Sequence, residues 1–302
     1  SQAILSRLSG QGRLMALDKD PEAVAAGIEK LGDDPRFSIV QGNYAEMERY
    51  VDYLLKEANL YAPVFAGQEC ESIYLGGGTP THLPSALLQR LIDGLTHRFQ
   101  LAPGAEFTIE SAPGSIPEDK LLLLKQLGVN RLSYGIQTLD EQLLAGLNRN
   151  YTVAGAREEL RNAVRIIGNV NIDTMYGFEG ESDHALLDTL REFVTLGVPC
   201  VSIYALDGQR CNSDRAKDMP ARDAQYDRKI EIYRAARDYL AGNGFRPVLQ
   251  NIFLQPERAS YKHQLRRWEN LPLVALGISS TGYAPRRLYH NQLGIKTWVE
   301  KL

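Results

Sequence analysis

A glycine-rich stretch at the end of an apolar run is the first feature of this sequence that could do chemistry. Residues 72–83 read SIYLGGGTPTHL, in which Gly76, Gly77 and Gly78 are followed by Thr79. Glycine lacks a Cβ atom, so its backbone N–H and C=O groups can come close to a ligand. The stretch could also be a tight strand-to-helix turn, but three glycines exceed what such a turn needs. It therefore predicts a binding loop.

Two carboxylates occupy similar places in later apolar runs. Glu110 ends the run EFTIE, and Asp173 lies in VNIDTMYG. A carboxylate at the end of a barrel strand points into the barrel mouth, where α/β barrels place their chemistry. A buried carboxylate also needs hydrogen-bond partners, which ribose hydroxyls would supply to Asp173. For Glu110 the alternative is a cap on the following turn, SAPGS.

A third carboxylate, Asp18, ends the run GRLMALD and precedes the helical segment KDPEAVAAG. An Asp in this place suits the ribose-binding corner of a doubly wound fold. That site also requires a glycine-rich turn one βα unit earlier, and these residues contain none. The alternative is a plain βα unit in which Asp18 caps the next helix.

Alternating strands and helices must position these residues. Helices are expected at 50–61, 84–99, 118–127 and 221–241. Strands are expected at 13–18, 37–41, 72–76, 106–111, 131–137, 170–176, 200–205 and 246–253. Most strand runs are read as continuously apolar, which is typical of strands covered on both faces. The βαβα order predicts an α/β fold with a parallel sheet, open or barrelled.

The composition indicates an ordinary globular chain. It has 302 residues, of which 44% are hydrophobic and 24% charged, with a net charge of −3. This charge gives no sign of a nucleic-acid or membrane partner, and no apolar run is long enough to span a bilayer. The first residues lack the pattern of a secretory signal, so a cytoplasmic location is expected.

The first part of the chain, residues 1–47, resembles a piece of the small-subunit rRNA cytosine methyltransferase family. The resemblance is carried by SQAILSRLSGQGRLMALDKDPEAVAAGIEKLGDDPRFSIVQGNYAEM. It implies a contribution to an S-adenosylmethionine (SAM) pocket, with Asp18 as the ribose carboxylate. The glycine loop, catalytic region and RNA-binding insertion of that family have no counterpart here.

From about Met47 onward, the chain resembles the radical SAM enzymes of the oxygen-independent coproporphyrinogen III oxidase type, a group that includes haem chaperones. Six motifs occur in order: MERYVDYLLKEANLYA, ESIYLGGGTPTHL, EFTIESAPGS, KLLLLKQLGVNRLSYGIQTLDEQLLAGLNRNYT, NVNIDTMYGFEG and GVPCVSIYAL. The resemblance implies a partial (βα)6 barrel with parallel strands. Its first strand and cluster loop would be replaced by a Rossmann-like βαβ fragment.

The same resemblance implies roles around bound SAM for ten residues in the barrel. These are Gly76, Gly77, Gly78, Thr79, Glu110, Gln137, Arg149, Asp173, Tyr204 and Ala205. Arg149 could instead be an exposed helical residue, and Tyr204 a core residue. His263, Trp268 and Ser279 would lie beside the substrate cavity, although His263 also fits a surface histidine.

The cysteines depart from the family pattern. Its 4Fe–4S cluster is bound by a CxxxCxxC loop, because such clusters require thiolate ligands. Here Cys70, Cys200 and Cys211 are far apart, and no CxxC or CxxxCxxC occurs. The sequence therefore predicts a SAM pocket, no metal ligands and doubtful radical activity. The later YxLxxxPGT pattern is also altered, to YALDGQRCN.

Three functions follow from these patterns. The first is a SAM-binding protein of the coproporphyrinogen-oxidase-like family that acts on a tetrapyrrole or similar small molecule. The second is a barrel that holds SAM or haem without turnover. The third is a class I SAM-dependent methyltransferase fragment built around Asp18. The expected divisions are 1–47 (methyltransferase-like), 48–210 (barrel) and 211–302 (an extension that covers the barrel).

Overall fold

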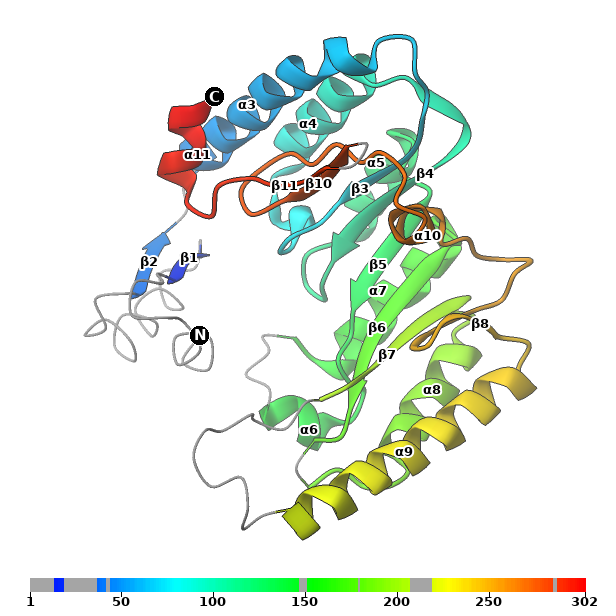
Figure 1. The fold of residues 1–302 in the computed structure, drawn as a ribbon. Coiled ribbons are helices and arrows are strands. Elements are labelled where there is room, and N and C mark those ends of the chain that lie inside the picture. Colours follow the sequence, from blue (N-terminus) through cyan, green and yellow to red (C-terminus); the bar gives the residue numbers. More distant parts are fainter. Residues whose placement is uncertain are drawn as a thin grey trace.

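A seven-stranded sheet runs through the middle of the structure, in the order β3-β4-β5-β6-β7-β9-β8 (Figure 1). The computed structural model describes residues 14–18, 37–41, 44–146, 151–178, 180–206, 219–284 and 287–302. The strands are β3 (Cys70–Leu75), β4 (Leu101–Ser111), β5 (Arg131–Gly135), β6 (Val170–Tyr176), β7 (Cys200–Ala205), β8 (Arg246–Leu249) and β9 (Ile252–Leu254).

Five neighbouring strands, β3 to β7, pair in parallel. The pairs β7–β9 and β8–β9 are antiparallel. This mostly parallel, curled half-barrel confirms the predicted α/β class. The single strand expected at 246–253 is wrong, because the chain turns at Gln250 and Asn251 and the two halves pair with each other.

One face of the sheet is apolar and is covered by helices. The helices are α4 (Ser85–Arg98), α5 (Glu118–Gln126), α7 (Val153–Ile166), α8 (Ala185–Thr195) and α9 (Met219–Gly242). In α7, Val153, Ala156, Leu160 and Ala163 are buried. Their spacing places them on one side of the helix, toward the sheet. Alternate strand residues such as Ile109 and Ile172 complete this core.

The opposite face of the sheet is polar, because side chains alternate between the faces of a strand. Its side chains come from the same register positions of β3 to β7. They are Ser72, Tyr74, Glu106, Thr108, Glu110, Arg131, Ser133, Asn171, Asp173, Cys200, Ser202 and Tyr204. We call this set the polar face. The expectation of strands apolar on both faces is therefore wrong for β3 to β7.

Most of the remaining elements lie beside the β3 edge of the sheet, whereas α6 lies toward α9 (Figure 1). Helix α3 (Tyr44–Tyr61) packs on α4, and α10 (Lys262–Trp268) contacts β3. The hairpin β10–β11 (Thr281–Ala284, Arg287–His290) and α11 (Ile295–Lys301) follow. The ring of Trp298 in α11 packs between Tyr50 and Tyr53 of α3. Two 3-10 turns, η1 (Ala62–Phe65) and η2 (Pro80–His82), and the short helix α6 (Glu141–Gly146) complete the elements.

The strands β1 (Leu14–Asp18) and β2 (Phe37–Gln41) form their own parallel two-stranded sheet. Neither pairs with the seven-stranded sheet, in which β3 is an edge strand. In Figure 1 the β1–β2 pair lies apart from that edge.

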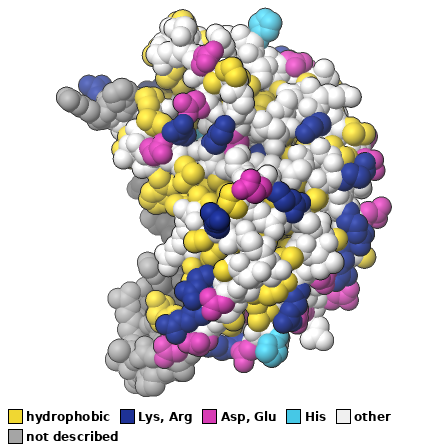
Figure 2. Space-filling model, turned by 90° about the vertical axis from the view of Figure 1, so that its right-hand side faces the viewer, with side chains coloured by type: hydrophobic (Ala, Val, Ile, Leu, Met, Phe, Trp, Pro, Cys, Tyr) yellow, Lys and Arg dark blue, Asp and Glu magenta, His cyan; other side chains and the backbone are white. Residues whose placement is uncertain are grey.

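The outer surface carries charges of both signs. Figure 2 shows Lys and Arg side chains interspersed with Asp and Glu over one side of the molecule, in keeping with the small net charge of −3. Among the described residues, no helix has both the length and the apolar character required to cross a membrane.

Candidate functional site

The glycine-rich loop leaves β3 at its carboxyl end and opens to solvent. Gly77 and Gly78 have φ angles of 87° and 132°, in the region that favours glycine. A Cβ atom built on either residue would meet nothing within 4 Å, so the space beside the loop is open. The Gly77 N–H donates a hydrogen bond of 3.0 Å to Glu110 Oε2. The loop is thus joined to the predicted carboxylate on the next strand.

Gly76 is glycine for a different reason, because its neighbours lie too close for a side chain. A Cβ atom there would stand 2.6 Å from Tyr74 Cε1 and 2.8 Å from Glu110 Cδ. The Tyr74 hydroxyl donates a hydrogen bond of 2.6 Å to Glu110 Oε1. Both oxygens of Glu110 are therefore held by groups of β3 and its loop.

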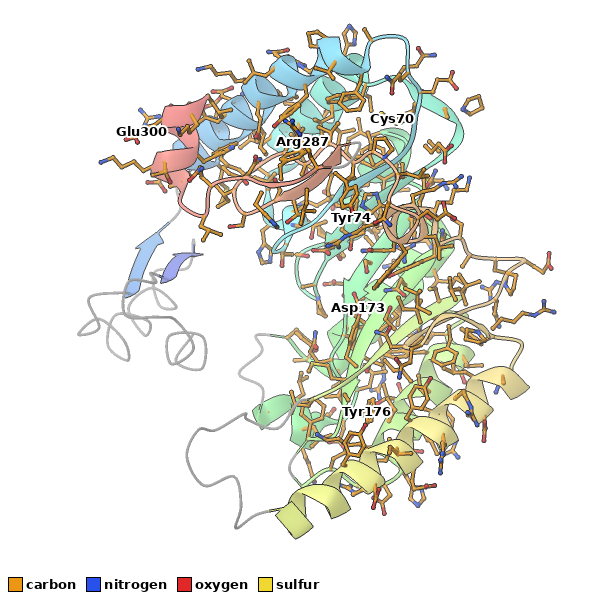
Figure 3. All side chains as sticks on the ribbon, viewed as in Figure 1. Cys70, Tyr74, Asp173, Tyr176, Arg287 and Glu300 are labelled. Carbon is orange, nitrogen blue, oxygen red and sulfur yellow. The ribbon has the colours of Figure 1, made fainter. Side chains whose placement is uncertain are left out.

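Asp173 lies on the polar face of β6, and its carboxylate is already hydrogen-bonded within the protein (Figure 3). Its Oδ2 accepts from Ser133 Oγ at 2.9 Å, and its Oδ1 accepts from Asn171 Nδ2 at 3.0 Å. Burial raises the pKa of Asp173 above its ordinary value, while these hydrogen bonds act in the opposite direction.

Gln137, Tyr204 and Ala205 lie at the carboxyl ends of β5 and β7. The main-chain carbonyl of Gln137 accepts from Met175 N and from Thr174 Oγ1, each at 2.8 Å, which ties this loop to β6. Tyr204 is 41% exposed, so the alternative of a core tyrosine is wrong. Its role at a ligand stays a prediction, as does that of Ala205.

The other predicted site residues, Thr79, Arg149 and Asp18, have no described contact with Glu110 or Asp173. Thr79 precedes the turn η2, and its carbonyl accepts from His82 N at 2.9 Å. Arg149 lies outside the described residues. Asp18 ends β1, whose only strand partner in the described part of the chain is β2, and its side chain is not described. The structure therefore brings the glycine loop and Glu110 into contact, with Asp173 two strands further along the sheet.

Lower on the polar face, toward the amino ends of the strands, is a network that the sequence reasoning missed. The Asn171 Oδ1 accepts from Ser202 Oγ at 3.0 Å and from Cys200 Sγ at 3.1 Å. The Asn171 Nδ2 donates to Ser133 Oγ at 3.1 Å, which connects the network to Asp173. The period-two alternation of polar residues in these strands was the signal that could have revealed it.

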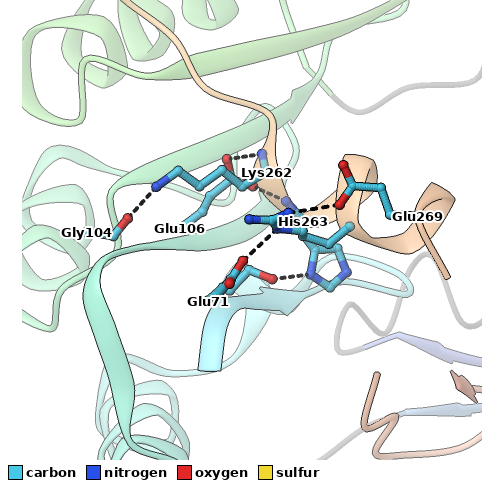
Figure 4. Close-up of polar contacts among 8 residues, drawn as sticks. Glu71, Gly104, Glu106, Lys262, His263 and Glu269 are labelled. Atoms are coloured by element: carbon cyan, nitrogen blue, oxygen red, sulfur yellow. Dashed lines mark hydrogen bonds and ion pairs between the residues drawn. The ribbon is translucent and has the colours of Figure 1, made fainter. Parts of the chain in front are cut away.

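A buried carboxylate and a buried guanidinium close the amino end of the polar face. Glu106 is 2% exposed and accepts hydrogen bonds from Ser260 Oγ (2.9 Å), Lys262 N (2.8 Å) and His263 N (3.0 Å) (Figure 4). Arg131, 1% exposed, donates through Nε to Ser260 O. Its guanidinium carbon lies 4.5 Å from the centre of the Tyr261 ring, a cation–π distance.

His263 is not a surface histidine, so that interpretation was wrong. Its Nδ1 lies 3.0 Å from Ser72 Oγ, and its ring stacks on that of Tyr74 with centroids 4.9 Å apart. Burial lowers the pKa of His263 to about 4, so the imidazole is neutral near pH 7. Trp268, by contrast, is 70% exposed. Ser279 is exposed, with a φ of 58°.

The two described cysteines, Cys70 and Cys200, are not placed to bind one 4Fe–4S cluster together. Cys70 and Cys200 begin β3 and β7, which are separated in the sheet by three strands, and Cys211 lies outside the described residues. Burial raises the pKa of both described thiols, that of Cys200 to about 12, which opposes thiolate formation. Within the described residues, no three His, Cys, Asp or Glu side chains are grouped to hold a metal ion.

Comparison with known proteins gives one family match. The sequence model of the Radical SAM superfamily matches residues 29–193. The heme chaperone HemW of Lactococcus lactis subsp. lactis (strain IL1403) is 28% identical over 250 residues, which cover 81% of this chain and 64% of that protein. The HemW of Escherichia coli (strain K12) is 29% identical over 239 residues, covering 77% and 61% respectively.

The oxygen-independent coproporphyrinogen III oxidase of Escherichia coli (strain K12) is 30% identical over 232 residues, covering 72% of this chain and 48% of the oxidase. The chain thus spans less than two thirds of the length of these three relatives. The solved structure of coproporphyrinogen III oxidase (HemN) from Escherichia coli has a TM-score of 0.72 at 22% identity. It covers 100% of this chain and 72% of HemN, so the two share a fold.

These comparisons bear on the segment at residues 1–47 that was assigned to an rRNA methyltransferase. The superfamily match begins at residue 29, inside that segment, and the HemN fold match covers all of this chain. Neither match supports a methyltransferase origin for it.

Proposed function

Because the chain belongs to the Radical SAM superfamily, we propose that it binds S-adenosylmethionine at the carboxyl ends of β3 to β7. The observation that carries the proposal is the contact between Glu110 and the glycine loop, beside open space. Glu110 would accept a hydrogen bond from the SAM ammonium group or ribose. Backbone groups of Gly77 and Gly78 would lie against its methionine end, where no Cβ atom intervenes.

The charge of the site supports a cationic ligand. Glu110 and Asp173 bring carboxylates to the open end of the polar face, and SAM carries ammonium and sulfonium cations. Arg131 is the guanidinium of this face and lies at its closed end, near Glu106. Opposite charges attract at short distance, and water at this open end screens part of that attraction. Asp173 would receive ribose hydroxyls in addition to its protein donors.

Five further residues complete the proposed pocket around these two carboxylates. Gln137 and Arg149 would provide polar contacts to the carboxylate and ribose, and Tyr204 and Ala205 would line the adenine. Thr79 would extend the glycine loop. A 4Fe–4S cluster would supply the reductive cleavage of SAM in this superfamily. Cys70 and Cys200 are not placed to hold it and Cys211 lies outside the described residues, so we derive no radical step.

The substrate proposed beside SAM is a tetrapyrrole or a similar small molecule. The relatives are named as heme chaperones and a coproporphyrinogen III oxidase, and this supports the substrate class. The polar face and the open ends of β6 and β7, with exposed Tyr204, provide a surface on which such a ligand would rest.

Titration calorimetry with SAM tests the proposed cofactor. The wild-type protein should bind SAM, and Glu110→Gln should weaken binding at least about tenfold, because hydrogen bonds to a charged group contribute about 1.5–3 kcal/mol. The control is Glu118→Gln, on the exposed end of α5, which should bind as the wild type does. Absence of binding by the wild-type protein would overturn the proposal.

A second candidate function is the holding of haem or SAM without turnover. The positions and raised thiol pKa of Cys70 and Cys200 favour it, since neither supports a cluster. Titration with haem, followed by visible absorbance, should give a saturable spectral shift. A spectrum equal to the sum of free haem and protein would exclude haem holding while leaving SAM binding to calorimetry.

A further inference from the structure

We propose that the segment Ser260–His263 positions the Glu110 carboxylate through a relay in which His263 stacks on Tyr74 and Tyr74 donates to Glu110. The relay rests on the proposed function only in naming SAM as the ligand that Glu110 would bind. Its contacts lie within the protein and join the C-terminal part of the chain to the glycine loop. Tyr74 and His263 are positioning residues in this proposal, since they act through Glu110.

The relay begins at a fixed support. Glu106 holds the start of α10 with three hydrogen bonds, two of them from the main-chain N–H groups of Lys262 and His263. The carboxylate is buried, so water does not compete for these donors. The main chain at His263 is therefore anchored to β4, and this positions the His263 ring against β3 (Figure 4).

The second step is the contact between His263 and β3. The ring lies on Tyr74 with an interplanar angle of 27°, and Nδ1 meets the hydroxyl of Ser72. Ser72 and Tyr74 are two residues apart and thus on the same face of the strand. A neutral imidazole suits this place, because burial would remove hydration from a charged ring; Glu106 favours the charged form, while burial, Arg267 and Arg131 oppose it. The stack limits the positions open to the Tyr74 ring.

In the third step, the Tyr74 side chain, itself held by His263, fixes the position of the Glu110 carboxylate. The Tyr74 hydroxyl donates to Glu110 Oε1 at 2.6 Å, and Gly77 N–H donates to Oε2 at 3.0 Å. Burial raises the pKa of Tyr74, so its hydroxyl remains protonated and remains a donor over the ordinary pH range. Gly76 leaves no spare room beside this pair. A carboxylate held by two donors loses less rotamer freedom when a ligand binds it.

Hydrogen–deuterium exchange on the free protein tests the relay without SAM. In Tyr74→Phe, which keeps the ring and removes only the hydroxyl, peptides that contain Gly77 should exchange about tenfold faster, because Glu110 is less firmly held. His263→Ala should have a similar effect. Arg266→Ala removes only exposed ion pairs, to Glu71 of β3 and to Glu269, and should leave this exchange unchanged. Unchanged exchange in both Tyr74→Phe and His263→Ala would overturn the relay.

A double-mutant cycle on SAM affinity then tests the order of the steps. His263→Ala should raise the Kd for SAM about fivefold in the wild-type background and leave it unchanged in a Tyr74→Phe background, where the link to Glu110 is already lost. His263→Phe should restore most of the affinity, because it keeps the stacked ring. Equal effects of His263→Ala in both backgrounds would show a merely structural role and overturn the proposal.

The two proposals fail in distinguishable ways. If no variant and no wild-type protein binds SAM, the proposed cofactor is wrong, and exchange at Gly77 still decides the relay. If SAM binds and depends on Glu110 but is insensitive to Tyr74→Phe, the cofactor stands and the relay is rejected.

Discussion

The two ends of the polar face are built from the same strands but differ in what covers them. At the amino end, Glu106 and Arg131 are almost fully buried under residues 260–263. At the carboxyl end, Glu110 lies beside three exposed glycines. Glu106 and Glu110 are four residues apart on one face of β4, so the strand alone does not distinguish them.

Strand register therefore sets which polar side chains share a face of the sheet. The segments packed over that face then determine whether a given side chain is buried or open to a ligand. The hydrogen-bonding capacity of Glu106 is used by the main chain of α10, which closes that end. Glu110 is held by Tyr74 and Gly77, yet the space beside it remains open. The closed end therefore contributes mainly stability, and the open end is the candidate for binding. The predictions change groups at the two ends or in α10, and each measures either stability or SAM binding.

Glu106→Ala should produce the largest effect, and on stability. It leaves the buried N–H groups of Lys262 and His263 without an acceptor, so the free energy of unfolding should fall by about 3–5 kcal/mol. Urea unfolding followed by circular dichroism measures it. Glu118→Ala, an exposed carboxylate, is the matched control and should unfold like the wild type. A loss below about 1 kcal/mol would contradict the assignment of the closed end as a stabilising cluster.

Acid should destabilise the closed end through His263. Its pKa is lowered from 6.5 to about 4 in the folded protein, so the unfolded chain takes up the proton first. The contribution of the neutral ring to the free energy of unfolding is complete above about pH 6.5 and is lost as the pH falls toward about 4. The total loss over this range is roughly 3 kcal/mol.

His263→Phe keeps the ring and removes this titration. Its free energy of unfolding should therefore decline less than that of the wild type between those pH values, as measured by urea unfolding at each pH. Parallel curves for the two proteins would mean that His263 titrates alike in the folded and unfolded states.

Gly76→Ala should affect the open end more than the closed end. The new methyl group would displace Tyr74 and Glu110, which lie 2.6 and 2.8 Å from it, and SAM binding should weaken by about tenfold. Calorimetry measures the Kd. Gly242→Ala adds a methyl group that contacts nothing within 4 Å and should leave the Kd unchanged. Equal SAM affinities for the wild type and Gly76→Ala would show that the position of Glu110 does not contribute to SAM binding.

Arg266→Ala should have the smallest effect. Its guanidinium pairs with Glu71 of β3 and with Glu269 just after α10, and both pairs are exposed, so water screens them. The urea midpoint should match that of the wild type within measurement error. A clear loss of stability would show that α10 depends on its exposed ion pairs as well as on the buried Glu106.

Much of the fold was predictable because apolar runs and glycines delimit the elements. The strands expected at 170–176 and 200–205 have those same bounds in the structure. The strand expected at 246–253 did not survive, because a turn at Gln250 and Asn251 lets β8 and β9 pair. The error has a physical origin, since Gln250 and Asn251 are not one of the glycine-containing pairs that signal a two-residue hairpin turn.

Less of the site was predictable. The glycine loop and Glu110 were found from strand ends, since parallel strands bring their carboxyl ends to one edge. Tyr74, Glu106 and Arg131 were missed because the strands were read as continuously apolar and their period-two alternation of polar residues was overlooked. That alternation indicates a shared face, but the contacts of these side chains with residues 260–263 required the structure. His263 was misjudged as a surface residue, because nothing near it in sequence indicates Tyr74 as its neighbour.

The superfamily, a parallel sheet and the glycines that a close backbone approach and positive φ angles require could all be read from the residues. The sequence also determined that the cysteines have no cluster spacing. The tertiary structure was needed to show that Glu106 is buried whereas Glu110 lies beside open space. The segment that makes this difference, Ser260–His263, lies about 150 residues from both, and a contact at that separation exists only once the sheet has curled and α10 has docked on it.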